Sequence, residues 1–221
     1  MKIGIVCAMT KELMPLLSGL GKVNQEKING FSAYKLSKGN NDLIIIQSGI
    51  GEIYASGATA TLISLGVEQI YNFGVCGSLC EDYLSCDTVA VNGVVHYDFD
   101  LSPIDDVEVA VYPSETTPVI NAKSWLFDLI VSKFPNLKQG VCASADKFVA
   151  DESIKENLRK TYGAGICDME SAGVLLTAKT AGIPCFILKT VSDGKGGSEE
   201  YLKTVNTASS ICAELILEVI K

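Results

Sequence analysis

The chain has 221 residues, of which 48% are hydrophobic and 20% charged, so it can form one large domain or at most two small ones. Its formal net charge of −8 excludes the concentrated basic surface that binding to nucleic acid or to anionic membranes requires. No stretch is apolar for long enough to cross a bilayer, and no signal-peptide pattern is present, so we expect a cytoplasmic protein.

The N-terminal half of the chain alternates short apolar runs, which predict strands, with helical patterns. The turn-rich sequence KGNN at 38–41 indicates a hairpin, and the helix expected after the hairpin is rich in small residues. In chain order we expect a strand at 2–7, a helix at 10–20 with Thr10 as its N-cap, strands at 31–37 and 42–48, a helix at 51–66, and strands at 69–75 and 87–95.

The C-terminal half continues the alternation of strands and helices. In chain order we expect a strand at 107–113, a helix at 120–134, a strand at 139–149 that leads into a loop, a polar helix at 153–162, a strand at 165–169, a helix at 171–182, a strand at 184–193 and a last helix at 198–220. Continuous apolar strands that alternate with helices indicate a sheet covered on both faces. We therefore expect one α/β domain over residues 1–221, a three-layer αβα sandwich with a mixed central sheet.

Carboxylates and glycines follow the predicted strands at the points where the strands end. Glu12 follows the first strand, the turn GVCGS lies at 74–78, and Glu170 and Asp193 follow two later strands. Ligands of open α/β sheets bind beyond the carboxyl ends of the strands. Taken singly, each carboxylate could merely favour a helix N-terminus or a turn, and the glycines could merely permit a tight turn. Their joint placement predicts an enzyme that uses carboxylates.

Cysteine and histidine add little further chemistry. The eight cysteines lie mostly in apolar runs, which predicts buried free thiols. Cys76, Cys80 and Cys86 are close together but lack paired CxxC spacing, and His96 is the single histidine. We therefore expect no metal and no cofactor.

Five segments of the chain resemble the nucleoside phosphorylase family, above all its hydrolytic branch, the 5'-methylthioadenosine/S-adenosylhomocysteine nucleosidases. The segments are CAMTKEL at 7–13, QSGIGE at 47–52, NFGVCGSL at 72–79, DMESAG at 168–173 and TVSDGKGG at 190–197. The resemblance covers residue 1 to about residue 215. It implies a nucleoside phosphorylase-like fold, a homodimer, and hydrolysis of a purine nucleoside to free base and ribose moiety, as in methionine salvage.

The resemblance also implies the roles of three catalytic carboxylates. Asp193 matches the acid that protonates N7 of the leaving purine, and burial in a closed pocket would supply the raised pKa that this role needs. Glu12 matches the base that activates the attacking water. Glu170 matches the carboxylate that binds the ribose hydroxyls and supports positive charge on the sugar. This division between a proton donor and a base parallels glycoside hydrolysis.

Further residues match the family's substrate contacts. Met169 would pack on the ribose, Phe148 would stack on the purine, and the Val149 backbone would hydrogen-bond to the base edge. Gly77 would let the backbone approach the sugar. On residue type alone, core packing is the better interpretation of Met169 and Phe148. The remaining expected contacts with the substrate are Met9, Ile50 and Ser198.

The chain departs from the family pattern at four places. Val75 stands where the family usually has a serine, Lys189 where it has an arginine, and Ser198 where the methylthio-nucleosidases often have an aromatic residue. FDLSPID at 99–105 replaces a longer apolar loop, and we expect it to reach the 5' pocket of a partner subunit. A nucleosidase for another purine nucleoside is therefore an alternative.

Two further alternatives come from other functional classes. A phosphorylase of the same family would use phosphate in place of water, but phosphorylases bind phosphate with arginines, and the one arginine of this chain is Arg159 in a polar helix. A non-catalytic nucleoside-binding protein would not need all of Glu12, Glu170 and Asp193. Hydrolysis is the function that the residues favour.

Overall fold

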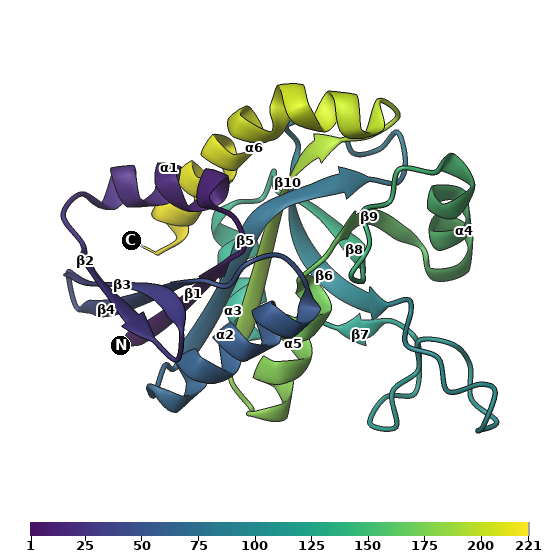
Figure 1. The fold of residues 1–221 in the computed structure, drawn as a ribbon, viewed down its shortest axis with the longest axis horizontal. Helices are drawn as coiled ribbons and strands as arrows, with labels where there is room; N and C mark the ends of the chain where they lie inside the picture. The colour runs from purple at the N-terminus through teal and green to yellow at the C-terminus, as the bar shows by residue number, and fades with distance from the viewer. Residues whose placement is uncertain (221) are drawn as a thin grey trace.

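A ten-stranded mixed sheet separates two layers of helices in the computed structural model, which describes residues 1–220 (Figure 1). The first half of the chain forms β1 (Lys2–Cys7), α1 (Thr10–Leu20), β2 (Asn24–Ile28), β3 (Phe31–Lys38), β4 (Asn41–Gln47), α2 (Glu52–Ser64), β5 (Gln69–Ser78) and β6 (Thr88–His96). The second half forms β7 (Ile120–Asn121), α3 (Trp125–Lys133), β8 (Lys138–Ser144), α4 (Glu152–Tyr162), β9 (Ala164–Asp168), α5 (Ser171–Thr180), β10 (Cys185–Asp193) and α6 (Gly197–Val219).

The two helical layers bury separate apolar cores against the sheet. Helices α1, α3 and α6 pack on one face, where Leu16, Phe127 and Ile216 belong to a single buried cluster. Helices α2 and α5 pack on the other face, and the small residue Ala58 is among the side chains that let α2 lie close (Figure 1). The predicted three-layer αβα architecture with a mixed sheet is confirmed. Among residues 1–220, none of the helices has the length and apolar character of a membrane span.

The strand order brings the ends of three strands to one residue, Gly77 of β5. Strand β5 lies parallel to β1 and to β10, and Asp193 at the end of β10 is in register with Gly77. From its other side, β9 pairs antiparallel with β5 and sets Cys167 opposite the same glycine. Because β10 also pairs with β6, the strands β5, β10, β6, β8 and β9 form a closed ring. The segments that follow β9 and β10 therefore meet beside β5.

Four local predictions are wrong. Residues 107–113 form turns, not a strand: Ala110 adopts a left-handed φ of 66°, and Phe99 stacks on Tyr112 at 3.9 Å between ring centroids. Helix α3 begins only at Trp125, because Ser124 caps it and residues 120–121 pair with β6. Strand β2, whose sequence is NQEKI, was not expected, since it is polar and exposed. The N-cap of α1 is Met9 and not Thr10.

Candidate active site

One cavity of about 470 Å³ lies where the ends of β9 and β10 meet β5. Every site residue predicted from the sequence lines it: Met9, Glu12, Ile50, Gly77, Phe148, Val149, Met169, Glu170, Asp193 and Ser198. They come from segments spread over the whole chain. The cavity wall is mainly apolar, and the carboxylates of Glu12, Glu170 and Asp193 are all nearly buried.

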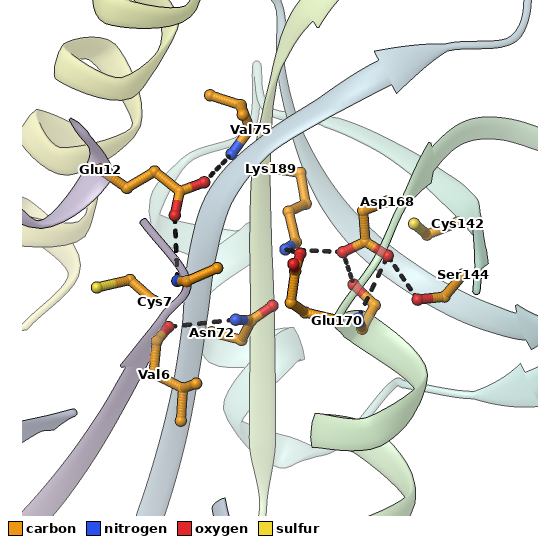
Figure 2. Close-up of polar contacts among 12 residues, drawn as sticks. Val6, Cys7, Glu12, Asn72, Val75, Cys142, Ser144, Asp168, Glu170 and Lys189 are labelled. Carbon is orange, nitrogen blue, oxygen red and sulfur yellow. Dashed lines mark hydrogen bonds and ion pairs between the residues drawn. The ribbon is translucent and has the colours of Figure 1, made fainter. Parts of the chain in front are cut away.

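Glu12 is held by backbone amides. Its Oε2 accepts hydrogen bonds from the N–H groups of Ala8 at 3.1 Å and Met9 at 2.8 Å. Its Oε1 accepts from Val75 N–H at 2.9 Å, as Figure 2 shows. The bond to Met9 also caps the first turn of α1. Burial raises the pKa of Glu12, while Lys189 and the three amides oppose that rise. The carboxylate is thus fixed in place, and its raised pKa makes it a stronger base than an exposed glutamate, as a general base requires.

Gly74 is required beside Glu12. A Cβ atom at position 74 would collide with the Oε1 atom of Glu12, so only glycine lets the carboxylate reach β5. The neighbouring Val75 keeps its amide for Glu12, and its side chain lines the cavity. The valine at this position therefore leaves the hydrogen bonds of Glu12 intact.

Glu170 is the N-cap residue of α5 and lies at the end of a buried charge network. Its Oε1 accepts from Gly51 N–H at 3.2 Å. Gly51 has a φ of 107°, and a Cβ there would collide with Asp146. Burial raises the pKa of Glu170 to about 8, against the attraction of Lys189.

Lys189 forms its main ion pair with Asp168. The Nζ atom lies 2.7 Å from Asp168 Oδ2 and 3.9 Å from Glu170 Oε2, and Figure 2 shows it between these acids and Glu12. Burial alone would raise the pKa of Asp168, but Lys189 and the hydroxyls of Ser144 and Ser171 lower it below its usual value. Asp168 is therefore the main counter-ion of Lys189.

A buried hydroxyl connects Asp168 to a further acid, Glu52. The Ser144 Oγ atom lies 2.6 Å from Asp168 Oδ1 and also makes a short hydrogen bond with Glu52. A hydroxyl has one proton to donate, so two ionised acids cannot both be satisfied by it. Burial raises the pKa of Glu52 to about 7, which favours a protonated Glu52 that donates to Ser144.

Asp193 is aimed into the cavity by a β-bulge at Ser192. The register of β10 against β5 shifts between Val191 and Asp193, and such a bulge re-aims the side chain that follows it. The Ser192 hydroxyl lies 2.8 Å from Asp193 Oδ1. Burial raises the pKa of Asp193 to about 6, with the hydrogen bond from Ser192 acting in the opposite direction. A carboxyl group of this kind can hold a proton near neutral pH.

The apolar wall of the cavity is partly open. Phe148 is 46% exposed and contacts the Tyr201 ring edge-on at 5.9 Å between centroids, so it is not a core residue. The Tyr201 hydroxyl lies 3.4 Å from the Met9 sulfur. Ser198 lies in the first turn of α6, after the N-cap Gly196. These side chains leave room for an aromatic ring and an apolar group.

Sequence reasoning missed several lining residues. Cys76, Lys147, Cys167, Ser192 and Leu202 also face the cavity. Ser192 directly precedes Asp193, and Cys167 lies two positions before Met169, so their proximity to a predicted site residue was a usable signal. Leu202 follows Tyr201 on α6 and carried no such signal.

Comparison with known proteins gives consistent results. A family model described as the phosphorylase superfamily matches residues 2–221. The aminodeoxyfutalosine nucleosidase of Helicobacter pylori strain J99 is 31% identical over 235 residues, which cover 98% of this chain and 99% of that protein. The 5'-methylthioadenosine/S-adenosylhomocysteine nucleosidase of Buchnera aphidicola strain Tuc7 is 30% identical over 229 residues, covering 99% and 98%.

A solved structure extends the similarity to the whole fold. The Helicobacter pylori 5'-methylthioadenosine/S-adenosylhomocysteine nucleosidase, in complex with a pyrrolidinol that carries an amino-pyrrolopyrimidine, superimposes with a TM-score of 0.93. The two sequences are 28% identical, and the match covers 99% of this chain and 97% of that one.

Proposed function

Because this chain belongs to the phosphorylase superfamily, we propose that it hydrolyses the N-glycosidic bond of a purine nucleoside, foremost 5'-methylthioadenosine or S-adenosylhomocysteine. The observation that carries the proposal is the convergence of Glu12, Glu170 and Asp193 on one apolar cavity. Inorganic phosphate, a metal or a redox group is not needed for this reaction. A base, an acid and a stabiliser of positive charge are sufficient.

In the proposed reaction, the bond between C1' of the ribose and N9 of the purine breaks, and the oxygen of water bonds to C1'. Glu12 takes a proton from that water. Asp193 gives its proton to N7, so that the purine leaves as a neutral base. Glu170 holds the ribose hydroxyls, and its negative charge stabilises the oxocarbenium-like transition state. The raised pKa values of Glu12 and Asp193 support this assignment of base and acid.

The proposed substrate contacts follow from the cavity wall. Phe148 stacks on the purine, the Val149 backbone bonds to the base edge, Met169 packs on the ribose, and Gly77 leaves space beside it. Met9, Ile50 and Ser198 surround the 5' substituent. Ser198 is smaller than an aromatic residue, which supports tolerance of larger 5' groups. Aminodeoxyfutalosine, the substrate for which the Helicobacter pylori relative is named, therefore belongs in the substrate panel.

The test is a panel of purine nucleosides, assayed for free base with and without phosphate. We expect release of adenine and free 5'-modified ribose, at a rate independent of phosphate. Lys189 is engaged by Asp168, and Arg159 is exposed on α4, outside the cavity, which supports water as the acceptor. Ribose-1-phosphate as the main sugar product would overturn hydrolysis in favour of phosphorolysis. Tight binding of a nucleoside without any release of base would indicate a binding protein.

We also propose a homodimer in the cytoplasm, as part of methionine salvage. Ile53 of α2 and Ile104 of the 99–105 segment are about 80% exposed, as expected of residues that a second subunit covers. Leu101 and Ile104 would then reach the partner's 5' pocket. All eight cysteines are free, which supports a reducing compartment. Light scattering of the wild type and of Ile104→Glu tests the dimer, and an active wild-type monomer would contradict it.

A further inference from the structure

The turn that follows Asp193 is held from two sides by charged side chains. The carbonyl oxygen of Gly194 accepts a hydrogen bond from Lys155 Nζ at 2.5 Å. The N–H groups of Gly194 and Gly196 both donate to Glu200 Oε2, at 2.9 and 3.1 Å. Lys155 belongs to α4 and Glu200 to α6. Two helices far apart in the sequence therefore fix the backbone next to Asp193.

Lys155 is buried to an unusual degree for a lysine. Only 3% of it is exposed, although α4 is otherwise a polar helix. Within residues 1–220, its ion-pair partner is Glu152, at 3.1 Å, whose own side chain is 64% exposed. Burying an ammonium group is costly unless it forms strong hydrogen bonds. The hydrogen bond from Lys155 to the Gly194 carbonyl oxygen offsets part of this cost.

Asp193 and the turn that follows it line two different cavities. Asp193 lines the cavity that contains Glu12 and Glu170. Gly194, Lys155 and Glu200 line a second cavity of about 490 Å³. A shift of the turn toward the second cavity would withdraw the Asp193 carboxyl group from the first. The two charged residues thus hold the wall that carries Asp193.

The same two residues supply the charges that Asp193 faces. Burial raises the pKa of Asp193, Lys155 acts to lower it, and Glu200 acts to raise it. Two other titratable groups face Asp193, Cys167 from β9 and Tyr201 from α6. Burial raises the pKa of both, so both are uncharged near neutral pH. Lys195, although close in sequence, pairs with Glu81 at the surface.

We propose that Lys155 and Glu200 are positioning residues for Asp193, which fix the turn at Gly194 from opposite sides and place one charge of each sign beside the acid. The proposal rests on the proposed function, in which Asp193 protonates the leaving purine. Neither residue touches the substrate. Each acts through the Gly194 peptide and through its charge.

The test compares the pH dependence of kcat/KM in Lys155→Met and Glu200→Gln with that of the wild type. Asp193 must be protonated to act as an acid, so its ionisation sets the alkaline limb. Removing the cation should move this limb up by about one pH unit, and removing the anion should move it down by about one unit. In both variants kcat should fall more than KM changes, because the acid is displaced and the substrate contacts remain.

Two controls separate charge from structure. Lys155→Arg keeps the cation and should restore the wild-type limb, whereas Lys160→Met removes an exposed cation of the same helix and should leave the profile unchanged. The proposal is overturned if the alkaline limb of kcat/KM does not move in Lys155→Met and Glu200→Gln. It is also overturned if the limb moves in the same direction in both variants. If the variants are less thermally stable but the pH dependence of kcat/KM is unchanged, Lys155 and Glu200 have only a structural role.

A second measurement does not depend on activity. The carboxyl carbon of Asp193, followed by ¹³C NMR with Asp193→Asn to assign the signal, should titrate at higher pH in Lys155→Met and at lower pH in Glu200→Gln. If the wild type cleaves no nucleoside but these shifts occur, the proposed function fails and the charge pair stands. If the wild type cleaves a nucleoside but these shifts do not occur, the proposed function stands and the charge pair fails. If Lys155→Met does not fold, the direction in which the pKa of Asp193 moves in Glu200→Gln decides the test alone.

Discussion

Glu12 and Asp193 line the same cavity, but they are held by different kinds of hydrogen-bond donor. Glu12 accepts from the backbone amides of Ala8, Met9 and Val75, whereas Asp193 lies beside the hydroxyl of Ser192. A backbone amide can only donate, so it favours an ionised carboxylate. A hydroxyl can donate or accept, so it suits a carboxyl group in either protonation state. The type of donor thus matches one residue to the role of base and the other to that of acid.

The largest effect is expected from removing the proton of the acid. Asp193→Asn should lower kcat by about 1,000-fold or more, because the amide keeps the shape but cannot protonate the leaving purine. Equilibrium binding of the substrate should be retained. Asp128→Asn, an exposed change on α3, is the matched control. A near-normal kcat in Asp193→Asn would remove Asp193 from the acid role.

Removing either of the other carboxylates should cost somewhat less. Glu12→Gln and Glu170→Gln should each lower kcat by about 100-fold, through loss of the base or of charge stabilisation. Both variants should still unfold cooperatively, as checked by calorimetry alongside steady-state kinetics. A variant that is inactive only because it is unfolded would show that its carboxylate has a structural role.

Two glycines of β5 allow the two carboxylates to be disturbed separately. A Cβ at Gly74 would collide with Glu12, whereas a Cβ at Gly77 would lie 3.1 Å from Cys167 Sγ and 3.3 Å from Asp193 Oδ2, tight contacts that small shifts relieve. Gly74→Ala should therefore lower kcat by about 10- to 100-fold, and Gly77→Ala by less than about 10-fold. If kcat falls equally in Gly74→Ala and Gly77→Ala, the Glu12 side chain moves away from an added methyl group as readily as Asp193 does.

The smallest effect concerns stability as a function of pH. The folded-state pKa is raised to about 6 for Asp193, about 7 for Glu52 and about 8 for Glu170. The folded chain therefore binds more protons than the unfolded chain between about pH 4 and 8, and stability falls as pH rises through this range. We expect the Tm of the free protein to be a few degrees lower at pH 8.5 than at pH 5.5.

Glu170→Gln provides the control for this pH effect, since it removes one of the raised carboxyl groups. The fall in Tm between pH 5.5 and 8.5 should be smaller in this variant, even though its kcat is greatly reduced. Such a result would mean that the ionised Glu170 is retained for activity at the expense of stability. A Tm that rises over the same pH range would contradict the raised pKa values.

Much of this molecule could be predicted from the sequence. The predictions of the family, the αβα fold and a nucleosidase are confirmed. The cavity also contains the predicted site residues, because most of them lie at or just after the end of a strand whose apolar run is easy to recognise. What could not be predicted depends on tertiary contacts. The VEVAVYP sequence at 107–113 has the residues of a strand, yet stacking of Phe99 on Tyr112 keeps it in a loop.

The electrostatic connections were also beyond sequence reasoning. Lys155 lies in a helix whose composition predicts exposure, and only the fold shows it buried against Gly194. Lys189 pairs mainly with Asp168, which lies on a different strand and is distant in the sequence. The bulge at Ser192, which aims Asp193, follows from the register of two strands that are distant in the sequence. Such features are determined by neighbours that no local pattern reveals.

The closed ring of strands has a consequence for self-association. Because β10 returns to pair with β5, the long strands on that side have partners on both edges, and among residues 1–220 the sheet's strand order ends at β2. An unpaired strand edge can template aggregation, and charged residues on it oppose this. Strand β2 carries Glu26 and Lys27 and is largely exposed. The polar sequence that concealed this strand from prediction is thus what allows it to border the sheet without recruiting further chains.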